Sequence, residues 1–238
     1  GAGFLGLGAA GIVTFGVVEL RSDSPVLNVR LFRDNRVFAL SNLAALINYG
    51  ATFAVAFVLT LYLQTVKGLS PLHAGLVLVA QPAVQTLLSP WAGKLSDRIE
   101  AQVVASAGMG ITAAGLFLLA VGLDGETRLV LIVGILALLG VGLALFSSPN
   151  TNAIMSSVEK RYYGVASGMV GTMRSVGMMT SMAIAMTAIS IFMGRVQVTP
   201  EVYPQFLASV TAILSVFVVL CVIGVFASLA RGKMRTGG

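Results

Sequence analysis

The sequence predicts an all-α membrane protein, and three observations lead to that fold class. Hydrophobic residues make up 57% of the 238 residues, charged residues make up 10%, and the mean hydropathy is +0.94. A soluble domain carries about 25% charged residues, so this chain is too apolar for water. Seven apolar stretches each reach the roughly 17 to 25 residues of a membrane-spanning helix. They are continuous runs, without the alternation of polar and apolar residues that a membrane β-strand requires.

The first stretch, residues 1–18, has no basic segment before it and no initiating methionine. A cleaved signal peptide is therefore not expected, and the simpler interpretation is a chain that begins partway into a longer protein, with a spanning helix at 1–19. A charged loop at 20–36 follows, in which Pro25 interrupts any continuing helix. Two interpretations of this loop stay open: Leu27, Leu31 and Phe32 lie against lipid at the membrane surface, or the loop is a solvated linker.

Six further helices follow within residues 37–230, joined by short connections, so that sequential neighbours are expected to be antiparallel. Short connections leave little room for a soluble domain, and the function is expected to lie between the helices. The predicted spans are 37–63, 70–92, 101–122, 128–156, 164–193 and 206–230.

Lysine and arginine are retained on the cytoplasmic side of membrane proteins, which predicts the orientation of the chain. Loops on one side hold eleven of these residues and loops on the other side hold three. We therefore expect a multi-pass protein of the cytoplasmic membrane, with its N-terminal end outside and a cytoplasmic tail at 231–238. The eleven are Arg21, Arg30, Arg33, Arg36, Lys94, Arg98, Lys160, Arg161, Arg231, Lys233 and Arg235, and the three are Lys67, Arg128 and Arg195.

Several function classes are not expected. Cys221 is the only cysteine and His73 the only histidine, so paired metal ligands of these types are excluded. The basic residues are spread over the loops without an aromatic-rich cluster, so no nucleic-acid partner is predicted. No combination of nucleophile, base and metal ligand is present, so the chain is not predicted to be an enzyme, and no cofactor is expected.

Arg174 is the only charged side chain well inside a predicted span. A central arginine costs roughly 2.5 to 3.5 kcal/mol on insertion scales, so it normally faces a bundle interior or a cavity. Two interpretations stay open: Arg174 faces a translocation cavity or a partner half, or it joins two helices or reaches toward the membrane surface. Uncharged polar residues at similar depth either line a wet cavity or hydrogen-bond between helices.

Four motifs occur in a recognisable order. GKLSDR contains Gly93, Leu95, Ser96, Asp97 and Arg98 and is similar to the cytoplasmic signature of major facilitator superfamily transporters. SPLHAG at 70–75, SPNTN at 148–152 and GVASGMVGTMRSVG at 164–177 resemble further segments of the 14-helix drug:proton antiporter family of the EmrB/QacA type. Glu100, Ala101 and Gln102 stand where that family usually has a glycine and a basic residue.

The resemblance implies the six-helix C-terminal half of a major facilitator fold, preceded by one linker transmembrane helix, with the N-terminal transporter half missing. Proton-coupled efflux of amphipathic compounds or drugs, driven by the proton gradient, would be its activity. An uptake permease, a non-transporting helical scaffold and an inactive fragment are the alternatives. The helices that border the cavity in this fold select Asn42, Asn48, Tyr49, Gln81, Gln85, Asn150 and Arg174 as substrate-cavity candidates.

In the signature, Gly93 would let two helices approach closely, while Asp97 and Arg98 would form an ion pair in one state of a cytoplasmic gate. The alternative is a solvated turn. No aspartate or glutamate lies deep in the spans at 37–230, whereas proton relays generally use such carboxylates. The proton carrier is therefore expected on the missing half, and this chain alone is not expected to transport.

Overall fold

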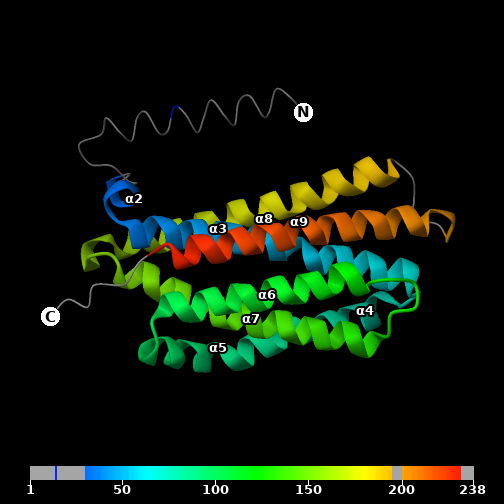
Figure 1. Ribbon diagram of the computed structural model, residues 1–238, viewed down its shortest axis with the longest axis horizontal. Helices are drawn as coiled ribbons and strands as arrows, with labels where there is room; N and C mark the ends of the chain where they lie inside the picture. The colour runs from blue at the N-terminus through cyan, green and yellow to red at the C-terminus, as the bar shows by residue number, and fades with distance from the viewer. Residues whose placement is uncertain (1–13, 15–29, 195–199, 232–238) are drawn as a thin grey trace.

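The computed structural model describes residues 14, 30–194 and 200–231 (Figure 1). Outside this part of the chain lie the predicted first helix except residue 14, residues 20–29 of the charged loop, residues 195–199 and residues 232–238 of the predicted tail. The described residues form helices and turns without a strand. Six helical segments are long and apolar enough to cross a membrane. The all-α fold class is confirmed.

The helices begin and end close to the apolar runs that predicted them. In chain order they are α2 (Arg30–Asp34), α3 (Arg36–Leu61), the π-helical turn η1 (Tyr62–Val66), α4 (Pro71–Leu78), α5 (Ala80–Arg98), α6 (Ala101–Gly122), α7 (Leu129–Ser156), the 3₁₀ turn η2 (Lys160–Tyr162), α8 (Tyr163–Met193), the 3₁₀ turn η3 (Pro200–Val202) and α9 (Tyr203–Leu229).

Two prolines inside the spans act differently. Pro82 has no backbone N–H to donate to the carbonyl of Leu78, and the helix is broken at Val79, between α4 and α5. Pro149 does not interrupt its helix. Helix α7 continues through Pro149 to Ser156, so the loss of one hydrogen bond is tolerated there.

The long helices run side by side along the bundle, with α8 and α5 at opposite edges of the view in Figure 1. Extensive packing joins α5 to α7, α7 to α6, α6 to α9, α9 to α3 and α3 to α8. The same neighbours result when α3 is exchanged with α7, α5 with α8 and α6 with α9. The first three and the last three of these helices are therefore packed in equivalent ways. Helices α5 and α8 occupy equivalent places in these two groups of three and do not pack extensively on each other.

Glycines allow three of these helix pairs to approach closely. A Cβ atom on Gly142 of α7 would lie 2.8 Å from the carbonyl oxygen of Gly108 in α6. A Cβ atom on Gly140 of α7 would lie 2.6 Å from the carbonyl oxygen of Gln81 in α5. A Cβ atom on Gly177 of α8 would lie 2.6 Å from the carbonyl oxygen of Leu46 in α3. Any larger residue at these positions forces the backbones apart.

The short helix α2 packs on the protein. Leu31 and Phe32 lie against a cluster that contains Phe38 and Met169, and the rings of Phe32 and Phe38 meet edge to face at 4.9 Å. Both side chains are half-buried, so part of their apolar surface packs on the bundle itself, a contact that neither interpretation of this loop included. Leu27 lies outside the described residues.

We predict that Gly142→Ala lowers the stability of the bundle by about 1–3 kcal/mol, the usual cost of overpacking, because its methyl group would meet Thr112 and Gly108. Gly134, on the same helix, has open space around its Cβ position, so Gly134→Ala serves as the control. Thermal unfolding in detergent measures both. Equal melting temperatures for the two variants would contradict the close α6–α7 contact.

Candidate functional site

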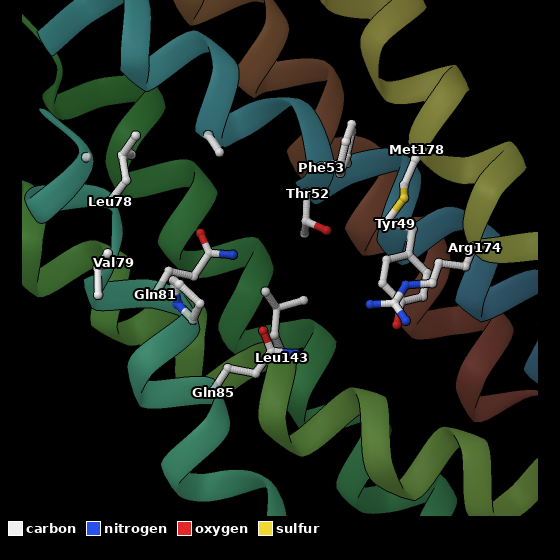
Figure 2. Close-up of a pocket in the computed structure, with 13 residues that line it drawn as sticks. Tyr49, Thr52, Phe53, Leu78, Val79, Gln81, Gln85, Leu143, Arg174 and Met178 are labelled. Carbon is white, nitrogen blue, oxygen red and sulfur yellow. The ribbon is translucent and has the colours of Figure 1, made fainter. Parts of the chain in front are cut away.

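A cavity of about 410 Å³ lies in the gap between α5 and α8 (Figure 2). Its volume lies within the range of small-molecule sites, about 300–1,000 Å³. Helices α3 and α7 form its floor, and the break between α4 and α5 forms part of one wall. Its lining residues are Tyr49, Thr52, Phe53, Ala56, Gly75, Leu78, Val79, Gln81, Pro82, Gln85, Leu143, Arg174 and Met178.

Arg174 and Tyr49 form one wall of this cavity. Arg174 lies eleven residues after the start of α8, about 16 Å along the helix axis, within a helical segment that is long and apolar enough to cross a membrane. Its guanidinium carbon lies 4.9 Å from the centre of the Tyr49 ring, within the range of a cation–π interaction. The arginine thus lines the cavity and contacts a neighbouring helix, which combines parts of both interpretations left open by the sequence.

Gln81 and Gln85 lie on the opposite wall, one helical turn apart on α5, as Figure 2 shows. Their amides supply hydrogen-bond donors and acceptors without a net charge. Leu143 of α7 and Thr52 of α3 lie between the two walls. The cavity therefore combines one cation, one phenol and two amides within a mostly apolar lining.

The three asparagine candidates lie outside this lining. Asn48 is 0% exposed, and neither its Nδ2 nor its Oδ1 has a hydrogen-bond partner among the described residues. Asn42 is also buried and donates from Nδ2 to the carbonyl of Phe38 at 2.9 Å, while its Oδ1 has no partner among the same residues. Tyr49, which follows Asn48 in the sequence, lines the cavity because it lies on another face of α3.

Asn150 belongs to a buried polar cluster where four helices end. Its Nδ2 donates to the carbonyl of Ser41 at 3.1 Å, and its Oδ1 accepts from Nη1 of Arg231 at 2.7 Å. Arg231 also donates to Ser41 Oγ at 3.0 Å and to the carbonyl and hydroxyl of Ser228. Ser106 Oγ donates to Ser228 Oγ at 2.7 Å, so α3, α6, α7 and α9 are joined.

Arg231 is the first residue of the predicted cytoplasmic tail, and its side chain is buried in the structure. The side chain is 2% exposed, because its neutral partners are contributed by the interior of the bundle. Burial lowers the pKa of Arg231 to about 10, so the guanidinium stays charged at neutral pH and is held by neutral oxygen acceptors.

The signature motif lies at the same end of the bundle, which we call the basic end because Lys94, Arg98, Lys160 and Arg161 lie there. Gly93 approaches α7 closely, since a Cβ there would lie 3.1 Å from Ser148 Oγ. Asp97 and Arg98 are both exposed. The described residues contain an ion pair between Arg161 and Glu159 at 3.0 Å and none between Asp97 and Arg98.

A second cavity, of about 500 Å³, opens beside this motif. Ser96 and Asp97 line it from α5, and Tyr163 lines it from the start of α8, together with Ala101, Asn152, Met155 and Ser156. Leu95 is half-buried and does not line it. The described part of the chain contains no group of three potential metal ligands.

The cavity between α5 and α8 brings together Tyr49, Gln81, Gln85 and Arg174 from distant parts of the sequence. Its apolar members, such as Phe53, Leu143 and Met178, carried no signal that distinguished them from lipid-facing residues. The pairing of Arg174 with Tyr49 also had no sequence signal, because it depends on how α3 and α8 are rotated.

Comparisons with known proteins agree on one protein family. A family model described as Major Facilitator Superfamily matches residues 4–182 and 42–233 in two alignments. The riboflavin transporter RibZ of Clostridioides difficile is 31% identical over 173 residues, which cover 71% of this chain and 38% of that protein. The multidrug resistance protein Stp of Mycobacterium tuberculosis is 33% identical over 176 residues, which cover 74% of this chain and 32% of that protein.

A tetracycline resistance determinant of Streptomyces rimosus is 31% identical over 199 residues, which cover 79% of this chain and 55% of that protein. The match to each of these relatives covers less than two thirds of the relative's length. For RibZ it covers 38% of the length and for Stp 32%.

We predict that Asn150→Leu destabilises the bundle by about 2 kcal/mol, because it removes an acceptor from the buried charge of Arg231. Asn152 lies two residues later on the same helix and is exposed. Asn152→Leu should therefore change the free energy of unfolding by less than about 0.5 kcal/mol. Chemical unfolding in mixed micelles measures both, and a harmless Asn150→Leu would contradict the structural role assigned to this cluster.

Proposed function

Because this chain belongs to the Major Facilitator Superfamily, we propose that it is the C-terminal half of a secondary active transporter that exports amphipathic compounds or drugs in exchange for protons. The whole protein would be of the 14-helix drug:proton antiporter type. Its missing N-terminal half would supply the second wall of the pathway, and its surroundings would be the cytoplasmic membrane of a cell.

The observation that carries this proposal is the cavity between α5 and α8. Transporters of this fold place substrate sites near the middle of the bilayer, between their two halves. The cavity has Arg174 well inside α8 and polar groups on both walls, as such a site would require. A bundle that served only as a scaffold would have no reason to keep a cation and two amides around an open space within hydrocarbon.

The faces of α5 and α8 support the proposal of a second half. Ala92 is the only residue of α5 that is buried, although this helix has the length of a membrane span. Helix α8 likewise leaves most of its surface exposed. A partner half that covers both faces would close the cavity into a central pathway, and rocking of the two halves would open it to each side in turn.

The carboxylate that carries the proton would belong to the other half. The described Asp and Glu residues of this chain lie at helix ends and in loops, outside the interior of the spans. Arg174 is unsuited to this task, because an arginine side chain does not release its proton under physiological conditions. This half would therefore contribute substrate contacts and the gate at the basic end, with that end in the cytoplasm.

The names of the relatives do not point to a single direction of transport. Two of them are named resistance proteins, and one is named a riboflavin transporter without a stated direction. An uptake permease of the same fold would use the same cavity. A non-transporting scaffold would not.

We predict that cysteines introduced at the cavity react with a charged, membrane-impermeant methanethiosulfonate reagent. Gln81→Cys and Gln85→Cys should be labelled, because water must fill a translocation cavity. Asn48→Cys should stay unlabelled, because its position is fully buried. Labelling of the protein at its natural length in membrane vesicles is measured by mass spectrometry.

The wild-type protein is its own background control, since Cys221 is fully buried. Imposing a proton gradient should change the labelling rate at Gln81→Cys, because alternating access exposes the cavity to one side at a time. Unreactive cysteines at both glutamines under all conditions would favour the scaffold and contradict the transporter.

A further inference from the structure

Arg174 has unused hydrogen-bonding capacity in the cavity. The face of the Tyr49 ring contacts the cation, but the N–H donors of a guanidinium lie in its plane and need oxygen or nitrogen acceptors. No hydrogen bond or ion pair joins Arg174 to another of the described residues. Arg231 shows the contrast, since four hydrogen bonds to protein acceptors hold its guanidinium.

The rest of the lining does not balance this charge. Gln81 and Gln85 on the opposite wall are neutral, and none of the described aspartates and glutamates lines the cavity. An organic cation placed here would be repelled by the charge of Arg174, and no acidic side chain in the lining would offset that repulsion. An anionic group would instead form short, charge-assisted hydrogen bonds with the guanidinium.

The apolar part of the lining fits a ring system. Phe53, Leu78, Leu143 and Met178 surround the space between the two polar walls. Aromatic and thioether side chains contact flat ring systems favourably. The glutamine amides can hydrogen-bond to polar atoms at the far edge of such a ligand.

From this arrangement we propose that the cavity recognises amphipathic organic anions, with the negative group of the ligand on the Arg174 guanidinium and its aromatic ring between Phe53, Leu143 and Met178. This inference rests on the proposed transport function and narrows its substrate class. Arg174 is thereby a specificity-determining residue that disfavours cationic compounds.

Three probes with the same ring system and different charge test the proposal. They are 2-naphthoate, neutral 2-naphthamide and cationic 2-naphthylmethylammonium, titrated calorimetrically into the protein at its natural length in nanodiscs of uncharged phosphatidylcholine. We expect naphthoate to bind about tenfold or more tightly than the cation, with the amide in between. This comparison uses only the wild-type protein, so its result does not depend on whether a variant folds.

Variants then assign the preference to one residue. Arg174→Gln should weaken naphthoate binding about tenfold and abolish the preference, while binding of the amide is retained. Arg174→Lys should keep part of the preference, because it keeps the charge without the planar donors. Arg128→Gln, which removes an exposed arginine at the other end of the bundle, should change nothing.

The outcomes separate the two proposals. Equal binding of the three probes, tighter binding of the cation, or a preference that survives Arg174→Gln overturns the inference and leaves the cavity as a binding site. Absence of binding by all three probes overturns the inference and also counts against a translocation cavity at this place.

Discussion

Hydrocarbon offers no hydrogen-bond partner to a polypeptide backbone and no advantage to burying apolar surface, and this constraint determines how the helices meet. Association then depends on close packing, and Gly142, Gly140 and Gly177 provide it at the α6–α7, α5–α7 and α3–α8 contacts. The chain of contacts from α5 through α7, α6, α9 and α3 to α8 ends at two helices that do not pack extensively on each other. The cavity lies in that gap, so the packing of the small residues determines where a ligand can bind.

Two arginines illustrate how the same constraint yields different roles. Arg231 is buried and fully surrounded by neutral acceptors from Ser41, Asn150 and Ser228, so it joins helix ends. Arg174 lies well inside α8 and contacts the Tyr49 ring, and the N–H donors of its guanidinium are left for groups that enter the cavity. A charge that the protein does not satisfy by itself at such depth is costly. Its presence is understandable where a ligand or water supplies the missing acceptors.

The six spanning helices could be predicted because uninterrupted apolar runs of the right length have no other stable form in a membrane. Which side chains line the cavity could not be predicted to the same degree. Asn48 and Tyr49 are adjacent, yet one is buried and the other faces the cavity, because successive residues point about 100° apart on a helix. Apolar residues surround most of each helix, so hydropathy carries little information about rotation. The burial of Arg231 escaped prediction for a related reason: two of its partners, Ser41 and Asn150, come from distant segments of the sequence.

The central claim is that water reaches the cavity wall while lipid and protein shield the rest of the bundle. Hydroxyl-radical footprinting of the wild-type protein in nanodiscs tests it at three methionines. Met178 lines the cavity, its neighbour Met179 is 72% exposed but does not line it, and Met109 is buried in the core. The account predicts rapid oxidation of Met178 and slow oxidation of the other two. Oxidation of Met179 as fast as Met178, or protection of Met178 equal to that of Met109, would contradict it.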